Sequence, residues 1–401
     1  MIRLDIQTNI PGCADGTYRV RAKGCIAAAL YWADEHGALP DWTPFAYIPI
    51  SPSGVGEFRF TGHRAIPKDA THILVRGIRS AMATTEETIA ELPNHDRQEP
   101  VPGAVRLGVM TDLHLSGKPW TVRKALRMAG ESSAVLCAGD MVNDGLSEQY
   151  ALLYNAINEA LPDTVLLAVA GNHDYPIRPL PQILCGICDY PTLQDWLLRH
   201  TERMGHPFEL DESGAYAVNL NGIDIIGLNA ASHYRRLTFK KDGQLMWLAR
   251  HLDTVQAVWH IILCHAPLLA HNPQRQGPNM PPYFSRDSHL QEILDTHRNI
   301  IFLSGHTHLS FNCRKGCVEL DPERNNLYVN CGSIRPTTLK PDEPIQPNEW
   351  TDGNIIWLDI TEDQVEITAV SLESGQRISR GYYHYPLAVH GEGKQQKKST
   401  G

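Results

Sequence analysis

Between residues 105 and 303 the chain carries five short, mainly apolar runs, and each of them leads into aspartate, asparagine or histidine. Short apolar runs bounded by Gly, Pro or polar residues are typical of buried strands. In α/β proteins, binding sites collect at the sheet edge formed by the carboxyl ends of such strands. The pattern therefore predicts an α/β domain with a functional site at that edge. The runs cover residues 105–110, 134–138, 165–170, 260–264 and 300–303.

Helical patterns separate the first three runs. One lies at residues 121–128. In the other, Leu146, Tyr150, Leu153 and Ile157 recur at helical spacing. This part of the chain is therefore expected to alternate between strands and helices.

Seven residues at the ends of the apolar runs form a ligand set of oxygen and nitrogen atoms. Such ligands suit Mn²⁺, Fe or Zn²⁺ and require no thiolate. Seven ligands exceed what one tetrahedral catalytic ion binds, so we expect two divalent ions that share one carboxylate. Each histidine alone could be a surface or core residue, because the chain has 19 of them, but the joint pattern favours a metal site. The predicted ligands are Asp112, His114, Asp140, Asn172, His265, His306 and His308.

The order of the motifs, Asp-x-His, Gly-Asp, Gly-Asn-His-Asp, His and Gly-His-x-His, resembles that of the calcineurin-like metallophosphoesterase family. The resemblance extends from about residue 105 to about residue 335 and includes all five blocks. It implies an α/β fold of the αββα type, a two-sheet β-sandwich flanked by helices, with a binuclear metal site along one edge. It also implies a hydrolase that acts on phosphoric ester bonds.

The resemblance also assigns roles by position. The first metal would be held by Asp112, His114 and His308, the second by Asn172, His265 and His306, and Asp140 would bridge the two. His173 matches the family's histidine that contacts the scissile phosphate and protonates the leaving oxygen. A metal-bound hydroxide would be the nucleophile, since the cations lower the pKa of bound water.

Residues 139–145, Gly-Asp-Met-Val-Asn-Asp-Gly, most resemble the class III cyclic-nucleotide phosphodiesterase branch of this family. Many relatives carry an aspartate three residues after the bridging one, where it orients the catalytic histidine, whereas this chain has Asn143. An amide accepts a hydrogen bond but carries no charge, so we expect a less basic His173. Asp144 and Asp174 are the candidate catalytic residues that could replace the carboxylate, and the sequence leaves this choice open.

The first hundred residues predict an all-β module. Phe58 and Phe60 alternate with polar residues, as do Ile73 and Val75, and aromatic runs lie between Gly- and Pro-containing turns. Several short strands at this spacing indicate a small β-sandwich of the Ig or fibronectin kind. Residues 84–103 turn polar and contain prolines, so we expect a linker there.

Three parts follow from these patterns. We expect a β-sandwich module at residues 1–100, a metallophosphoesterase catalytic domain at 101–385 and a disordered tail at 386–401. Strand-like runs at residues 355–358 and 365–370 would complete the second sheet of the catalytic domain. The module shows no catalytic constellation, so a structural or recognition role is expected, with an unknown partner.

Composition excludes several classes of protein. A formal net charge of −9 argues against coating nucleic acid or binding an anionic membrane. No apolar run reaches the length of a membrane span, and the N-terminus lacks the apolar core of a signal peptide. Nine cysteines, an odd number in a long chain, do not indicate a disulfide scaffold. We therefore expect a cytoplasmic protein that acts on a small phosphoester substrate.

A long insert at residues 175–212 follows the Gly-Asn-His-Asp motif, first Pro-rich and then helical. Such loops shape the pocket of an enzyme whose scaffold is fixed. Arg178 or Arg286 could pair with a phosphate, as guanidinium groups do, although a solvated surface position is the favoured interpretation for each.

Two pairs of cysteines flank the predicted site in the sequence. They could form a structural Zn²⁺ site that ties the insert to the rim of the active site. The alternative, reduced thiols without a ligand, is favoured by their loose spacing. The cysteines are Cys185, Cys188, Cys313 and Cys317.

Three hypotheses of function follow. The first is a metal-dependent phosphodiesterase that hydrolyses a cyclic nucleotide or another small diester. The second is a phosphomonoesterase on the same binuclear centre. The third, a non-catalytic metal-scaffold binding protein, is disfavoured by the complete ligand set and His173.

Overall fold

The computed structural model describes residues 2–7, 16–34, 36–39, 44–60, 70–80, 83–91, 100–176, 186–230, 243–271, 287–311, 317–335, 353–372, 375 and 377–386. Arg178, Cys185, Arg286 and Cys313 lie outside these residues, as does the expected tail from residue 387 onward. The phosphate-pairing arginines, the zinc site and the disordered tail therefore stay predictions.

A six-stranded sheet contains the first three apolar runs, in the order β11-β10-β9-β19-β20-β21. Its parallel strands are β9 (Val105–Met110), β10 (Ala134–Cys137) and β11 (Val165–Ala168). Its antiparallel strands are β19 (Asn354–Ile360), β20 (Gln364–Ser371) and β21 (Arg377–Pro386). β19 and β20 confirm the two strands expected after residue 350, and they complete the sheet of the first three apolar runs and not that of the last two.

A seven-stranded sheet contains the other two runs, in the order β12-β13-β14-β15-β16-β18-β17. Its parallel strands are β14 (Ile223–Leu228), β15 (His260–Cys264), β16 (Ile300–Ser304) and β18 (Asn326–Asn330). Its other strands, β12 (Phe208–Leu210), β13 (Tyr216–Leu220) and β17 (Val318–Asp321), pair antiparallel.

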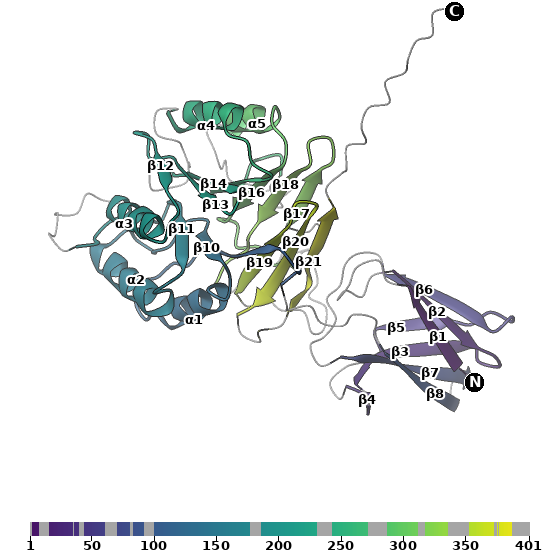
Figure 1. Ribbon diagram of the computed structural model, residues 1–401. Helices are drawn as coiled ribbons and strands as arrows, with labels where there is room; N and C mark the ends of the chain where they lie inside the picture. Colours follow the sequence, from purple (N-terminus) through teal and green to yellow (C-terminus); the bar gives the residue numbers. More distant parts are fainter. Residues whose placement is uncertain are drawn as a thin grey trace, which may run out of the picture.

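The two sheets pack face to face, and helices cover their outer faces (Figure 1). One apolar core joins both sheets, with Val109 and Leu167 on one side and Ile261 and Leu303 on the other. A second core lies under α1 (Trp120–Ala129), α2 (Ser147–Ala160) and α3 (Tyr190–Arg203), and a third under α4 (Gly243–Thr254) and α5 (Asp287–Leu294). The expected αββα fold is confirmed.

Helix α1 shows how the sequence produces these outer layers. Val122, Ala125, Leu126 and Ala129 recur at helical spacing and are all buried. They form one apolar stripe that packs on the six-stranded sheet, while the other side of the helix stays polar. The helices expected at residues 121–128 and 146–157 are both confirmed.

The strands before residue 92 form two further sheets around their own apolar core, drawn in purple and dark blue in Figure 1. Tyr18, Trp32 and Ile73 lie in this core, and Trp32 stacks on Phe45 with ring centroids 4.2 Å apart. The expected small all-β sandwich is present, and its Ig or fibronectin likeness and the domain boundaries stay predictions. The strands are β1 (Ile2–Gln7), β2 (Gly16–Ala22), β3 (Ala27–Asp34), β4 (Gly37–Ala38), β5 (Ala46–Pro49), β6 (Val55–Phe60), β7 (His72–Ser80) and β8 (Ala83–Glu91).

The linker expected at residues 84–103 is wrong in its first part, where β8 pairs antiparallel with β7. β8 is an edge strand, and such strands carry polar residues without losing their pairing. Glu87, for example, forms an ion pair with Arg76 on β7 at 2.6 Å. Polar composition alone therefore made an edge strand resemble a linker.

A buried carboxylate lies between two histidines at the edge where β14 and β15 begin. His251 Nε2 lies 3.0 Å and His260 Nδ1 2.7 Å from Oδ2 of Asp224. Burial raises the pKa of Asp224, but hydrogen bonds from both histidines outweigh it and lower the pKa overall. Burial lowers the pKa of His251, but Asp224, with help from Glu209, outweighs it and raises the pKa overall.

The His251→Gln substitution is expected to cost more stability in mild acid than in base. A raised histidine pKa adds stability that is complete below its unfolded value of about 6.5 and disappears as pH rises through the folded value. The lowered pKa of Asp224 adds stability that is lost only in acid, near and below its unfolded value of about 3.9. Chemical denaturation should show a loss of about 1–3 kcal/mol at about pH 5.5 and a smaller one at about pH 9.

The control for this experiment is His289→Gln, which changes an exposed histidine on α5 and should give a small, pH-independent difference. An equal penalty for His251→Gln at both pH values would show that the histidine contributes only by packing.

Candidate metal centre

Loops at the carboxyl ends of five strands bring the predicted ligands together. β9, β10 and β11 belong to one sheet, and β15 and β16 to the other, so the site lies where the two sheets meet. In chain order these loops carry Asp112 and His114, then Asp140, then Asn172, then His265, and finally His306 and His308.

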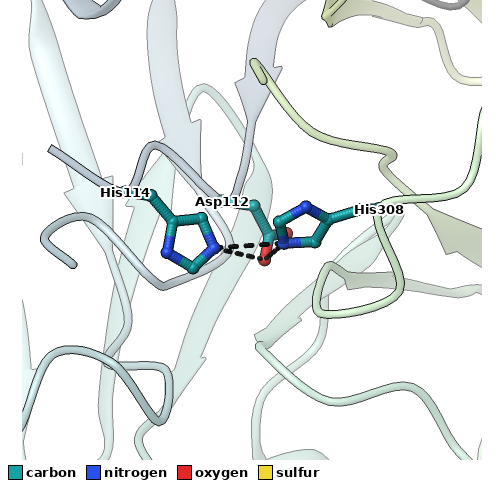
Figure 2. A group of neighbouring side chains, drawn as sticks. All are labelled: Asp112, His114 and His308. Atoms are coloured by element: carbon teal, nitrogen blue, oxygen red, sulfur yellow. Dashed lines mark hydrogen bonds and ion pairs between the residues drawn. The ribbon is translucent and has the colours of Figure 1, made fainter. Parts of the chain in front are cut away.

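The first group of ligand atoms comes from Asp112, His114 and His308 (Figure 2). Nε2 of His308 lies 3.0 Å from Oδ1 of Asp112, and Nε2 of His114 lies 3.7 Å from the same oxygen. The two Nε2 atoms are 3.1 Å apart. Three ligand atoms that converge in this way fit one cation, and they are the three residues expected for the first metal.

The second group comes from Asp140, His265 and His306. Nε2 of His265 lies 3.1 Å from Oδ2 of Asp140, and Nε2 of His114, a member of the first group, lies 3.7 Å from that oxygen. Asp140 therefore lies within reach of both groups, as a bridging carboxylate must.

Three buried atoms of the predicted ligands make no hydrogen bond of regular geometry, although two of them lie close to another ligand atom: Oδ1 of Asp112, Oδ1 of Asn172 and Nε2 of His265. Unpaired polar atoms in the interior are costly, so such a cluster needs an explanation. His265 gives the clearest case, because its Nδ1 donates to the carbonyl of Ala138 at 2.8 Å. Its Nε2 faces Oδ2 of Asp140 at 3.1 Å and is the nitrogen that could bind a metal once it loses its proton, which is the arrangement of a metal-ligating histidine. These residues fit a pair of divalent cations.

The pKa values of the two carboxyl groups also fit a role as metal ligands. Burial raises the pKa of Asp112, but the neighbouring imidazoles of His114 and His308 outweigh it and hold the pKa well below its usual range. Burial likewise raises the pKa of Asp140, and the charge of His265 more than offsets this. In return, although burial lowers the pKa of His265, Asp140 raises it to about 10. The pKa of His306, depressed by burial and by His265, is about 4. Both carboxylates are thus kept ionised, as metal ligands must be.

At the site the backbone adopts a left-handed conformation, with positive φ, that residues other than glycine rarely take. Eight non-glycine residues of the described chain have positive φ, and five of them are predicted ligands with φ between 41° and 69°. Such conformations cost free energy and persist where the surrounding structure imposes them, often at functional sites. The five are Asp112, His114, Asp140, His306 and His308.

Two motif glycines are required because a carboxylate lies against each. A Cβ on Gly171 would lie 2.2 Å from Oδ1 of Asp140, and one on Gly305 would lie 2.4 Å from Oδ2 of Asp112. These distances are far below van der Waals contact, so any side chain there would displace a predicted ligand.

His173 lies beside the first group, with its ring 4.7 Å from that of His114. Its Nδ1 lies 2.6 Å from the backbone carbonyl oxygen of Asn143. A carbonyl only accepts hydrogen bonds, so Nδ1 carries the proton and Nε2 is the acceptor nitrogen of the neutral ring. The orienting partner is thus the main chain at position 143.

Asp144 and Asp174 occupy structural positions close by. Oδ2 of Asp144 accepts from Gln149 at 2.8 Å, near the start of α2. Asp174 is fully buried and accepts backbone amides from Met141 at 2.9 Å and Gly171 at 2.8 Å, which fixes two ligand loops. Burial, reinforced by the charge of Asp140, raises its pKa to about 7. Their catalytic role stays a prediction.

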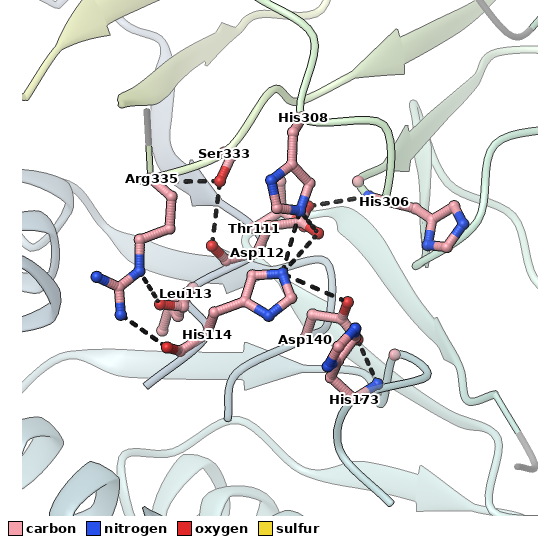
Figure 3. Close-up of polar contacts among 12 residues, drawn as sticks. Thr111, Asp112, Leu113, His114, Asp140, His173, His306, His308, Ser333 and Arg335 are labelled. Carbon is pink, nitrogen blue, oxygen red and sulfur yellow. Dashed lines mark hydrogen bonds and ion pairs between the residues drawn. The ribbon is translucent and has the colours of Figure 1, made fainter. Parts of the chain in front are cut away.

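Sequence reasoning did not identify Ser333 and Arg335, whose side chains bond to the loop that holds Asp112 and His114 (Figure 3). They follow β18, which runs parallel to β16 and ends at the same edge. The rule that sites collect at strand carboxyl ends would have found them had β18 been recognised as a strand.

A model of the calcineurin-like phosphoesterase family matches residues 105–310, or 206 of the 401 residues. The chain belongs to this family. The match spans all seven predicted ligands and confirms the resemblance at the level of the family. The calcineurin-like phosphoesterase described here is therefore a hydrolase that acts on phosphoric esters with divalent metal ions.

Several solved structures are similar to this phosphoesterase at low sequence identity. Purple acid phosphatase PPD1 from yellow lupin (Lupinus luteus) seeds is 14% identical, with a TM-score of 0.46 over 92% of this chain and 71% of that one. Yfce, a phosphoesterase from E. coli, is 17% identical, with a TM-score of 0.31 over 71% of this chain and 100% of that one. GAP50, the anchor in the inner membrane complex of Plasmodium, is 12% identical, with a TM-score of 0.40 over 71% of this chain and 88% of that one. No curated protein sequence matches the chain.

Within the described residues of this phosphoesterase, no helix combines the length and the apolar character needed to cross a membrane.

The Asn143→Ala variant is expected to keep kcat/KM within about threefold of wild type, equivalent to about 0.6 kcal/mol. The bond that orients His173 comes from the backbone carbonyl of residue 143, which the substitution retains. Steady-state kinetics on an alkyl phosphodiester measures the effect. A loss of about 100-fold or more with full metal occupancy would show that the side-chain amide is needed instead.

Proposed function

We propose that this phosphoesterase hydrolyses a small phosphodiester, such as a cyclic nucleotide, at a binuclear centre bridged by Asp140. The observation that carries the proposal is the position of Oδ2 of Asp140, 3.1 Å from His265 and 3.7 Å from His114. One carboxylate oxygen thus faces ligand atoms of both groups.

The proposed ligands are those expected from the sequence. Asp112, His114 and His308 would hold one ion, Asn172, His265 and His306 the other, and Asp140 both. The ligand atoms are oxygen and nitrogen, which suits Mn²⁺, Fe or Zn²⁺. When bound, two such ions supply Lewis acidity that neutralises charge on the phosphate and makes water a better nucleophile at neutral pH.

His173 is proposed as the general acid. Its Nδ1–H is held by the carbonyl of Asn143, so a second proton would reside on Nε2. A ligand atom of His173 lies within 4.8 Å of those of His114 and Asp140, which places the ring beside the centre. In that position it can deliver a proton to the leaving oxygen of a phosphate held there.

Preference for a diester rests on the likeness of residues 139–145 to the class III cyclic-nucleotide phosphodiesterase branch. An alkyl or ribose oxygen is a poor leaving group, and a histidine positioned as an acid suits it. The alternative is a phosphomonoesterase that uses the same centre.

A turnover panel tests the proposal. Purified enzyme with added Mn²⁺ would be assayed on bis-p-nitrophenyl phosphate, p-nitrophenyl phosphate and cyclic nucleotides. Diester turnover above monoester turnover is expected. Monoester turnover far above diester turnover would favour the alternative, and bound metal without any turnover would favour a non-catalytic scaffold.

We also propose that residues 1–100 and 101–385 act as separate domains. Apolar core residues before position 76 form their own cluster, distinct from the three clusters of the phosphoesterase part, which supports this division.

A further inference from the structure

The loop after β9 carries Asp112 and His114. Two other segments of the chain form hydrogen bonds with its backbone, one on each side. On one side its amides donate to the loop after β10. The amide of Asp112 bonds to the carbonyl of Gly139 at 3.0 Å, and the amide of His114 bonds to the carbonyl of Asp140 at 2.9 Å. These bonds connect the loops of the two predicted sites.

On the other side, the carbonyl groups of the loop face the segment after β18 (Figure 3). The amide of Ile334 donates to the carbonyl of Thr111 at 3.1 Å. The hydroxyl of Ser333 donates to the carbonyl of Asp112 at 3.1 Å. Two consecutive carbonyls are thus bound from one segment.

The guanidinium of Arg335 binds the next two carbonyls. Nε donates to the carbonyl of Leu113 at 2.9 Å, and Nη2 donates to that of His114 at 2.7 Å. The amide of Arg335 in turn donates to the hydroxyl of Ser333 at 3.0 Å, so the two residues are mutually oriented. Residues 333–335 therefore bind all four carbonyls from 111 to 114.

The loop needs such support because of its own backbone. Asp112 has φ 52° and His114 has φ 41°, in the left-handed region that non-glycine residues disfavour. The planar guanidinium presents donors in a fixed fork, which can hold two neighbouring carbonyls at a set spacing. A lysine ammonium keeps the charge but lacks this geometry.

We propose that Arg335, assisted by Ser333, is a positioning residue of the first metal site. It holds the loop in the conformation that directs the side chains of Asp112 and His114 at one ion. The inference rests on the metal assignment of the proposed function. A positive charge by itself would repel a cation, so a purely electrostatic role of Arg335 predicts the opposite effect on metal affinity.

Calorimetric titration of Mn²⁺ into metal-free enzyme tests the proposal. In Arg335→Lys, one of the two sites is expected to bind on the order of 10–100-fold more weakly, the usual effect of losing an outer partner of a ligand, while the other is unchanged. Activity at limiting Mn²⁺ should fall and return towards the wild-type kcat in excess Mn²⁺. Ser333→Ala removes the bond to the carbonyl of Asp112 and the acceptor of the Arg335 amide but keeps both guanidinium bonds, so it should show a smaller shift at the same site.

Arg324→Lys is the matched control. Nε of Arg324 also donates to a backbone carbonyl, that of Asp295, at 2.6 Å, and its Nη1 pairs with Asp321 at 2.8 Å. These contacts lie outside the loops that carry the predicted ligands, so both Mn²⁺ affinities should equal those of the wild type.

Unchanged affinities at both sites in Arg335→Lys and Arg335→Gln would overturn the positioning role, and so would tighter binding in Arg335→Gln. If Arg335→Gln does not fold, Arg335→Lys and Ser333→Ala decide the matter by the same titration. A wild-type enzyme that binds no Mn²⁺ would overturn the proposed function together with this inference. Two wild-type sites with unaffected variants would overturn the inference alone.

Discussion

The Asp140→Asn variant is expected to lose bound metal and activity together. Oδ2 of Asp140 faces His265 and His114, so an amide at this position removes negative charge from both groups of ligands. We expect kcat/KM to fall at least about 100-fold, equivalent to about 2.7 kcal/mol of transition-state stabilisation. Elemental analysis and kinetics on the same preparation measure both quantities.

Thermal unfolding gives an independent readout of the same change. Added Mn²⁺ should raise the melting temperature of the wild type by mass action, and that of Asp140→Asn much less. Asp359→Asn is the matched control, because Asp359 is a buried carboxylate that pairs with Arg106 at 2.7 Å, outside the ligand loops. It should be destabilised yet bind both ions. Two metals and near-wild-type turnover in Asp140→Asn would refute the binuclear assignment.

The His173→Ala variant is expected to separate substrates by their leaving groups. Nitrophenolate leaves readily as an anion, whereas a ribose or alkyl oxygen requires a proton. The variant should keep its metals and much of its activity on nitrophenyl esters. On alkyl or nucleoside esters it should lose on the order of 10²–10⁴-fold, the usual contribution of acid catalysis.

Comparing the two substrate types on one metal-loaded preparation tests this prediction. If His173 only binds the phosphate, both types should lose activity equally. Equal losses with full metal occupancy would therefore remove the general-acid role and leave an electrostatic one. Asn143→Ala serves as the companion variant, because it should leave both activities nearly unchanged.

Much of the fold and the grouping of the site residues follow from one regularity of the sequence. Residues such as Asp112, Asn172 and His306 follow apolar runs within one to three positions, and parallel strands end at a common edge. Periodicity therefore made the strands, two of the helices and the convergence of the ligands at one edge predictable. The αββα arrangement and the division of the ligands between two ions came from the resemblance to the family.

Backbone-mediated contacts could not be predicted in this way. The partner of His173 is a main-chain carbonyl, so no side-chain type at position 143 reveals it. Arg335 binds carbonyls of residues more than two hundred positions earlier. Recognising β18 as a strand would have placed Arg335 at the edge of the site, but not its contacts with the main chain. β8 was mistaken for a linker because an edge strand needs no apolar periodicity.

The position of the ligands at the junction of the sheets has a consequence for heat resistance. His114 and His308 are 194 residues apart in the sequence, and they extend from sheets that share an apolar core but are not hydrogen-bonded into one sheet. An ion held by both would act as a cross-link that closes a very long loop. In the chain-entropy model, closing such a loop is worth on the order of 5 kcal/mol. The temperature at which this enzyme unfolds would then follow the metal supply of its surroundings.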